Sequence, residues 1–116
     1  MKKTINIQGT LLDLSVPRVM GIINITPDSF YAASRRQFEE GIIERCRQII
    51  EEGGSMIDIG AQSTTPFSTF LSAKEEAERL MPALKSIRRE FPRAILSVDT
   101  FYADVAKQAV EEYGVD

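Results

Sequence analysis

The chain has 116 residues, 43% of them hydrophobic and 27% charged, which is typical of one globular domain and excludes a disordered segment or a coiled coil. A formal net charge of −3 argues against nucleic-acid binding through a basic surface, and no apolar run reaches the roughly 20 residues of a membrane span. The N-terminus lacks the long apolar stretch of a signal peptide, so we expect a cytoplasmic protein without a membrane partner. A single cysteine, Cys46, and no histidine leave carboxylates, amides, hydroxyls and basic side chains for any chemistry.

The first predicted element is a β-hairpin over residues 4–14. Two alternating stretches, Thr4–Gln8 and Leu11–Leu14, flank Gly9, which can adopt the positive φ of a tight turn.

A strand followed by a helix is then predicted three times. The strands are expected at Val19–Ile25, Met56–Gly60 and Ala94–Val98, because each is an apolar run of the kind buried on both faces of a sheet. After each strand and its polar loop, apolar residues recur at helical spacing. The expected buried faces are Phe38, Ile42, Cys46, Ile49 and Ile50; Ala77, Leu80, Leu84, Ile87 and Phe91; and Val105, Ala106, Ala109, Val110 and Tyr113.

Local signals mark the ends of these helices. Ser34 with Gln37, and Ser72 with Glu75, have the spacing of a capping box, in which each residue bonds the backbone of the other. Gly53–Gly54 and Gly114 are expected to end the first and third helices.

An unbroken strand–helix series predicts parallel strands in chain order, with the helices on one face and the hairpin at the amino-terminal end. The strands end at Asn24, Gly60 and Asp99, and this period is normal for a (β/α)8 barrel of about 250 residues. Three strands cannot close a barrel, and Val115–Asp116 resembles the start of a fourth. The expected fold class is therefore α/β: a leading β-hairpin and the N-terminal three β/α units of a TIM barrel. Residues 1–116 would be the N-terminal part of a single, incomplete barrel domain.

Polar residues gather at the carboxyl ends of the predicted strands, where parallel α/β folds place their sites. Asp99 suits the donors of an amino-heterocycle, and Asn24 suits a hard cation or a phosphate. Ser63 and Thr64 offer hydroxyl groups to an anion. Residues of these types also cap helices that follow strands, so both interpretations stay open. Asp58, within an apolar strand, is interpreted as a buried anchor for a neighbouring loop.

Three segments resemble the dihydropteroate synthase family, the sulfonamide-target enzymes of folate synthesis. Met20–Phe30 resembles its first signature, Gly53–Thr64 its second, and Leu96–Thr100 its motif on the third strand. The resemblance covers essentially the whole chain. It implies a pterin-binding transferase that condenses 6-hydroxymethyl-7,8-dihydropterin diphosphate with p-aminobenzoate, with Mg²⁺ assisting the departure of diphosphate.

The resemblance also implies roles for single residues. Asp99 would hydrogen-bond the pterin, and Asn24 would bind Mg²⁺ or the diphosphate. Thr64, with Ser63 beside it, would contact the diphosphate and the pterin. Thr26–Phe30 would lie on the first loop, with Thr26 near substrate and Phe30 against the aminobenzoate ring. Activity would need the later strands, and the full-length protein would be a homodimer.

Two positions depart from the family pattern. Ala32 stands where the family often has a loop aspartate, and Thr65 stands where it usually has an arginine. These changes weaken catalysis more than pterin binding, so a non-catalytic pterin-binding protein of the same fold is the alternative. The pterin-binding domain of folate-dependent methyltransferases ranks last, because that family lacks the Asn24–Phe30 block.

Overall fold

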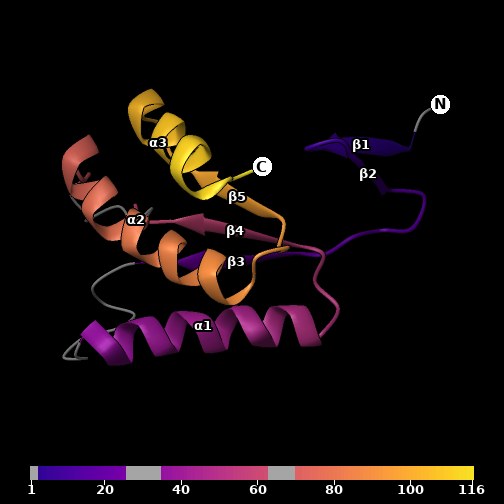
Figure 1. The fold of residues 1–116 in the computed structure, drawn as a ribbon, viewed down its shortest axis with the longest axis horizontal. Helices are drawn as coiled ribbons and strands as arrows, with labels where there is room; N and C mark the ends of the chain where they lie inside the picture. The colour runs from indigo at the N-terminus through magenta and orange to yellow at the C-terminus, as the bar shows by residue number, and fades with distance from the viewer. Residues whose placement is uncertain (1–2, 26–34, 63–69) are drawn as a thin grey trace.

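The computed structural model describes residues 3–25, 35–62 and 70–116. Figure 1 shows three helices on one side of a three-stranded sheet, and a separate two-stranded hairpin beyond the amino-terminal ends of the strands. In chain order the elements are β1 (Thr4–Ile7), β2 (Thr10–Asp13), β3 (Met20–Asn24), α1 (Arg35–Glu51), β4 (Met56–Gly60), α2 (Ala73–Glu90), β5 (Leu96–Asp99) and α3 (Ala103–Tyr113). No helix among these residues is long and apolar enough to cross a membrane.

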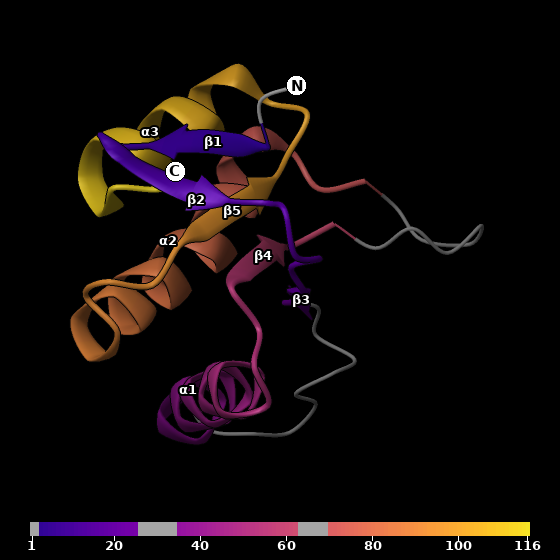
Figure 2. The same cartoon turned by 90° about the vertical axis from the view of Figure 1, so that its right-hand side faces the viewer.

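The three-stranded sheet is parallel, in the order β3-β4-β5, as predicted. The view in Figure 2 confirms that α1, α2 and α3 all cover the same face. Two strands are shorter than predicted, because their outer residues only partly join the ladder. Ile25 donates from its N–H to Gly60 O at 2.7 Å beyond the end of β3, and Ile95 O accepts from Ile57 N–H at 3.0 Å before the start of β5.

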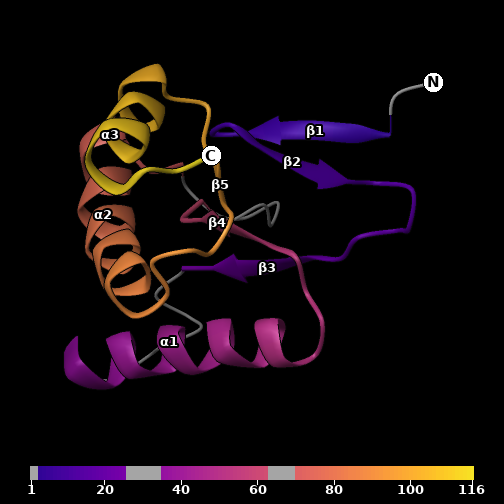
Figure 3. The same ribbon diagram turned by 45° about the vertical axis from the view of Figure 1, so that its right-hand side comes forward.

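The predicted hairpin is present as the antiparallel pair β1 and β2. Gln8 and Gly9 have φ values of 49° and 85°, and two positive φ angles define the tight turn that matches the twist of hairpin strands. The strands stop at Ile7 and resume at Thr10 because the turn takes only these two residues. The Gln8 side chain also donates to Gly114 O at 3.1 Å, which holds the hairpin against the end of α3 (Figure 3).

The core lies between the sheet and the helices, and most of the predicted helix faces contribute to it. They supply Ile42, Cys46, Ile49, Leu80, Leu84, Ile87, Val105 and Ala109, all buried. Ile50 and Val110 were expected in the core but are 41% and 53% exposed, so those two predictions are wrong. Each directly follows a buried residue, Ile49 or Ala109, and a step of one residue turns about 100° around a helix, away from the sheet.

The ends of the helices lie where the capping residues and glycines of the sequence predict them, as far as the described residues show. Ser72 Oγ accepts from Glu75 N–H and the Glu75 carboxylate accepts from Ser72 N–H, both at 3.2 Å, which confirms that capping box. Gly53 has a φ of 98° after α1, and Gly114 caps α3 with a φ of 60°. Ser34, the cap predicted for α1, lies outside the described residues.

Arg88 of α2 joins the ends of three elements, a role that the sequence analysis missed. Its guanidinium donates to the carbonyl oxygens of Tyr113 at 2.9 Å, Gly114 at 2.9 Å, Ala94 at 2.7 Å and Pro92 at 3.2 Å. These carbonyl groups belong to the end of α3 and to the segment that leads into β5. One side chain therefore satisfies backbone acceptors that helix ends and loops leave open.

The last two residues run beside β5. Asp116 N–H donates to Leu96 O at 2.8 Å, and the Asp116 carboxylate accepts from Leu96 N–H at 3.1 Å. The side chain of Val115 is buried and belongs to the core. These contacts lie along the free edge of the sheet, where the predicted fourth strand would begin.

Candidate functional site

One face of the parallel sheet carries no helix, and the candidate site lies on it. Side chains alternate along β3: Ile23 is buried beneath the helices, whereas Ile22 and Asn24 are exposed on the other face. Register extends this alternation across the sheet, because paired residues of parallel strands point to the same side. The open face therefore carries one row formed by Ile22, Asp58 and Ser97, and a second row formed by Asn24, Gly60 and Asp99.

The row of Asn24, Gly60 and Asp99 lies at the carboxyl ends of the three strands. Asn24 pairs with Gly60, and Gly60 pairs with Asp99. A Cβ added to Gly60 would lie 3.4 Å from Asp99 Cβ and 3.8 Å from Asp99 Oδ2, so the Asp99 carboxylate lies beside an uncovered backbone. The missing side chain leaves space between an amide and a carboxylate on one face, and neither makes a hydrogen bond within the described residues.

Of the six predicted substrate-binding residues, the structure describes only these two, Asn24 and Asp99, and it brings them into one row. The others, Thr26, Phe30, Ser63 and Thr64, lie outside the described residues.

The row of Ile22, Asp58 and Ser97 contains a polar pair directly below the row of Asn24, Gly60 and Asp99. Ser97 Oγ donates to Asp58 Oδ1 in a short hydrogen bond between β4 and β5. Asp58 was predicted to anchor a neighbouring loop; the partner that it has among the described residues lies on the adjacent strand instead. Strands only about 4.8 Å apart bring short side chains at paired positions within bonding distance. Asp58 and Ser97 each precede a strand-ending residue by two positions, a signal from which the pairing could have been predicted.

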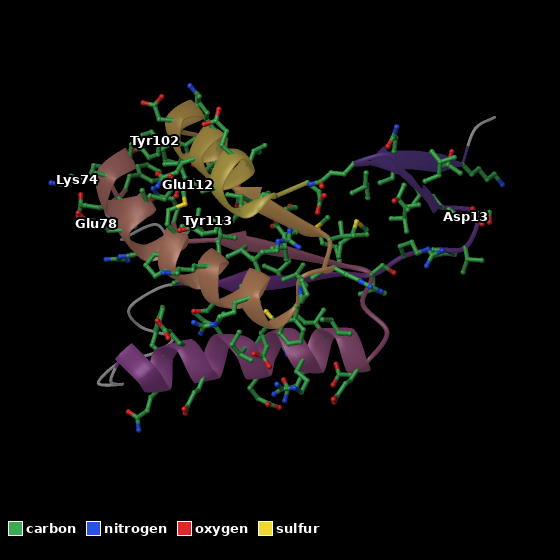
Figure 4. All side chains as sticks on the ribbon, in the orientation of Figure 1. Asp13, Lys74, Glu78, Tyr102, Glu112 and Tyr113 are labelled. Atoms are coloured by element: carbon green, nitrogen blue, oxygen red, sulfur yellow. The ribbon has the colours of Figure 1, made fainter. Side chains whose placement is uncertain are left out.

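A clamp joins the two residues that flank the loop after β4. Gln62 donates from Nε2 to Leu71 O at 3.1 Å, and Leu71 N–H donates to Gln62 Oε1 at 3.0 Å. The Tyr102 hydroxyl donates to the same Leu71 carbonyl at 2.5 Å. Figure 4 shows Tyr102 near the start of α2, which agrees with its bond to Leu71. The base of this loop is thereby tied to the segment that follows Asp99.

Glu76, on the first turn of α2, lies behind this clamp. It is 0% exposed, and one carboxylate oxygen accepts from Gln62 Nε2 at 2.7 Å. Nothing in the sequence singles out this residue, because a charged side chain next to the capping residue Glu75 is normally solvated.

Two exposed aromatic rings lie near the same edge. Phe70 and Phe101 are 70% and 61% exposed and meet edge to face, with ring centroids 5.6 Å apart. Phe101 also contacts the ring of Tyr102 at a centroid distance of 4.7 Å. This part of the edge therefore offers an apolar surface two residues from Asp99.

Cys46 is not part of the site. It is buried under the sheet in α1, and burial raises the pKa of its thiol to about 11. A thiol that stays protonated at neutral pH is neither a nucleophile nor a metal ligand. Among residues 3–25, 35–62 and 70–116, no three acidic or cysteine side chains converge on a metal position.

A groove of about 610 Å³ lies at the opposite end of the sheet, between the hairpin and the segments around Arg88, Ile95 and Gly114. In parallel α/β folds, chemistry is located at the carboxyl ends of the strands, so this groove is not the candidate site.

Comparison with known proteins shows the family to which this chain is similar. Residues 20–116 match the family model described as "Pterin binding enzyme". The chain is 36% identical to dihydropteroate synthase of Escherichia coli (strain K12) over 104 residues, 90% of this chain and 36% of that protein. It is 45% identical to the mitochondrial folate synthesis bifunctional protein of Arabidopsis thaliana over 94 residues, 79% of this chain and 17% of that protein.

The fold is also similar to that of a solved structure. The dihydropteroate synthase of Xanthomonas albilineans, solved with 4-aminobenzoic acid, superposes with a TM-score of 0.80 at 36% identity. The match covers 93% of this chain and 40% of that one. The chain therefore spans less than half the length of each of these three relatives.

Proposed function

The chain belongs to the pterin-binding enzyme family, and we propose that it is the N-terminal part of a dihydropteroate synthase. The proposed reaction joins 6-hydroxymethyl-7,8-dihydropterin diphosphate to p-aminobenzoate and releases 7,8-dihydropteroate and diphosphate. The observation that carries this proposal is the row of Asn24, Gly60 and Asp99 at the carboxyl edge, with an open space between an amide and a carboxylate.

The sheet would form the first three strands of a closed (β/α)8 barrel. Parallel sheets are normally covered on both faces, whereas here Ile22 is 67% exposed on the open face. In a barrel this face points inward and is filled by side chains from the other strands. The contact between Asp116 and Leu96 supports the addition of a fourth strand beside β5.

Asp99 would bind the pterin. A carboxylate accepts two parallel hydrogen bonds from the adjacent N–H groups of an amino-heterocycle, and ionised acceptors make the stronger bonds. Asp99 makes no such bond within the described fold and lies beside Gly60, where a flat ring has room to approach. Barrel closure would exclude water from this pair and strengthen it further.

The chain's contribution to the chemical step would be orientation and charge. In this step the amine nitrogen forms a bond to the pterin methylene carbon, the bond from that carbon to the diphosphate oxygen breaks, and the amine loses a proton. Asp99 would hold the ring so that the methylene carbon faces the amine. The resulting near-attack arrangement can contribute several kcal/mol to lowering the barrier, up to about 7–11 kcal/mol in the best intramolecular cases.

Asn24 would be the protein ligand of Mg²⁺. Its amide oxygen is a hard donor at the edge of the sheet, and Mg²⁺ prefers oxygen ligands and keeps several waters, so one protein oxygen together with the phosphate oxygens of the substrate would hold it. The residues present therefore fit this ion. When bound, Mg²⁺ supplies positive charge to the departing diphosphate.

Four further roles come from positions outside the described residues. Thr64, with Ser63 beside it, would contact the diphosphate and the pterin. Thr26 and Phe30 would lie on the first loop, with Phe30 against the aminobenzoate ring. We also propose that the complete protein is a cytoplasmic homodimer inhibited by sulfonamides, which mimic p-aminobenzoate.

The alternative is a pterin-binding protein without transferase activity, favoured by Ala32 and Thr65 in place of a carboxylate and an arginine. Two measurements on the complete protein that carries residues 1–116 separate these functions: conversion of labelled p-aminobenzoate to dihydropteroate, and calorimetric binding of the pterin diphosphate. Turnover supports the synthase, binding without turnover supports the alternative, and failure of both overturns the assignment of the site.

A further inference from the structure

We propose that Asp58 is a second carboxylate that binds the pterin and selects its reduced ring; this inference rests on the proposed function. Asp58 lies two residues before Gly60 on β4, and both face the open side of the sheet. Gly60 pairs with Asp99, so Asp58 lies one pleat deeper than Asp99, about 7 Å further from the carboxyl ends of the strands. The two carboxylates therefore line one face of the sheet at two depths.

Ser97 orients the Asp58 carboxylate and leaves one of its oxygens open. The Ser97 hydroxyl donates to Asp58 Oδ1. Within residues 3–25, 35–62 and 70–116, Asp58 Oδ2 has no hydrogen-bond donor, and no basic side chain forms an ion pair with Asp58. An ionised carboxylate has about four acceptor sites, so this oriented group keeps most of its capacity for a ligand.

Bare backbone separates the two carboxylates. Gly60 has no side chain, and a Cβ built on it would lie 3.8 Å from Asp99 Oδ2. A flat bicyclic ring can therefore lie over Gly60 and reach both Asp99 and the deeper Asp58. The gap thus admits one ring that meets acceptors at both depths.

The donors of a 7,8-dihydropterin match these two acceptors. Its 2-amino group and N3–H lie side by side at one end of the ring and suit the bidentate contact proposed for Asp99. Its N8–H lies along a different edge and needs an acceptor of its own once the site excludes water. Asp58 Oδ2 supplies this acceptor from the deeper row. A fully oxidised pterin has no hydrogen on N8, so an acceptor here favours the reduced ring.

Calorimetric titration of the complete protein tests this role with Asp58→Asn. Asparagine keeps the size of the side chain and an oxygen that accepts from Ser97, but it replaces Oδ2 with an NH₂ group that opposes the ring N–H. We expect the Kd for 6-hydroxymethyl-7,8-dihydropterin diphosphate to rise about 10- to 100-fold, because a charged acceptor is lost. The urea midpoint should be unchanged or higher, because a carboxylate with few partners has been removed.

The oxidised form of the same diphosphate makes the result specific to the ring N–H. The wild type should bind the dihydro form about tenfold or more tightly than the oxidised form, and Asp58→Asn should reduce this preference to within about twofold. Asp104→Asn is the matched control, since it makes the same change at an exposed acid in the first turn of α3. It should keep the wild-type affinity for both forms.

Two outcomes would overturn the inference. If Asp58→Asn lowers the urea midpoint and leaves both affinities unchanged, the partner of Asp58 is another side chain of the barrel. If it weakens both ring forms equally, Asp58 shapes the site without selecting the reduced ring. These are binding measurements, so they separate this inference from the proposed function. A wild type that binds the diphosphate without turnover contradicts the synthase, whereas the Asp58 variant still supports or overturns the role of this carboxylate.

Discussion

Ser97 donates a hydrogen bond to Asp58 between neighbouring strands, one pleat below the row of Gly60 and Asp99. The pair is half-buried on the open face of the sheet and keeps a carboxylate satisfied at a position that would lie inside a closed barrel. It joins β4 to β5 through side chains as well as through the backbone ladder. The part of the floor formed by β4 and β5 is therefore polar and internally bonded, whereas β3 contributes the apolar Ile22.

Ser97→Ala should destabilise the fold by about 1–3 kcal/mol, because it leaves the Asp58 carboxylate without its hydroxyl donor. Urea denaturation followed by circular dichroism measures this change. The double variant Ser97→Ala with Asp58→Ala should be less destabilised than the single variant, since no polar group is left unpaired. Equal stability of wild type and Ser97→Ala would mean that the hydrogen bond contributes nothing.

Gly60→Ala should reduce pterin affinity while leaving the fold nearly intact. The new methyl group would lie 3.4 Å from Asp99 Cβ, an ordinary contact, but it would occupy the space between Asn24 and Asp99. One extra methyl group in a fitted pocket is worth about 1–3 kcal/mol, so affinity should fall about 10-fold or more. Calorimetry on the complete protein measures it.

Gly53→Ala is the opposite control. Gly53 has a φ of 98°, where a side chain is strained, and it lies at the end of α1, at the amino-terminal end of the sheet. This variant should lose stability and keep its affinity for the pterin. If Gly60→Ala behaves in the same way as Gly53→Ala, the open space above Gly60 is not the ligand site.

Arg88→Ala should be the most destabilising surface change on α2, at about 2–4 kcal/mol, because four backbone carbonyl groups lose a charged donor. Arg88→Lys should recover little of this loss, since an ammonium group cannot reproduce the planar fork of a guanidinium. Denaturation midpoints measure both variants. Arg89→Ala, a neighbouring exposed residue, should change stability by less than about 0.5 kcal/mol, and a similar loss in both variants would contradict the role of Arg88.

The capping box of α2 should make stability depend on pH. Hydrogen bonds from the Ser72 backbone, then from the Ser72 side chain, lower the pKa of Glu75 below its usual 4.5. The depressed pKa means that the stabilisation is present above the unfolded-state pKa and is lost as pH falls through the folded-state pKa. Thermal melts between pH 7 and pH 3 should therefore show a smaller loss in Glu75→Gln, which keeps an acceptor for Ser72 but does not titrate. Superimposable pH profiles would show that the capping carboxylate has no such effect.

Local signals were enough to predict the hairpin and the Ser72 capping box, because each depends on residues close together in the chain. The parallel strands could be predicted from the unbroken strand–helix series, since such crossovers force parallel pairing. They also placed Asn24 and Asp99 at one edge, since strand ends align in a parallel sheet. Arg88 could not be predicted in the same way: its partners are backbone carbonyl groups up to 26 residues away and have no sequence signature. Glu76 was missed for a related reason, because its partner Gln62 lies 14 residues earlier, across a loop.

Asp99→Ala in the complete protein should weaken pterin binding about 5- to 100-fold, because paired N–H donors of the buried heterocycle would lose their acceptor, at about 1–3 kcal/mol. Asp99→Asn is the sharper variant: it keeps the size of the side chain but turns one acceptor into a donor that opposes the ring N–H groups. Asn should therefore be no better than Ala, whereas a role for Asp99 in packing alone predicts that Asn retains binding. Asp104→Ala removes an exposed acid from the first turn of α3 and serves as the charge control. Calorimetric titration of the pterin diphosphate into all three variants decides the matter, and wild-type affinity in Asp99→Ala would reject Asp99 as the pterin ligand.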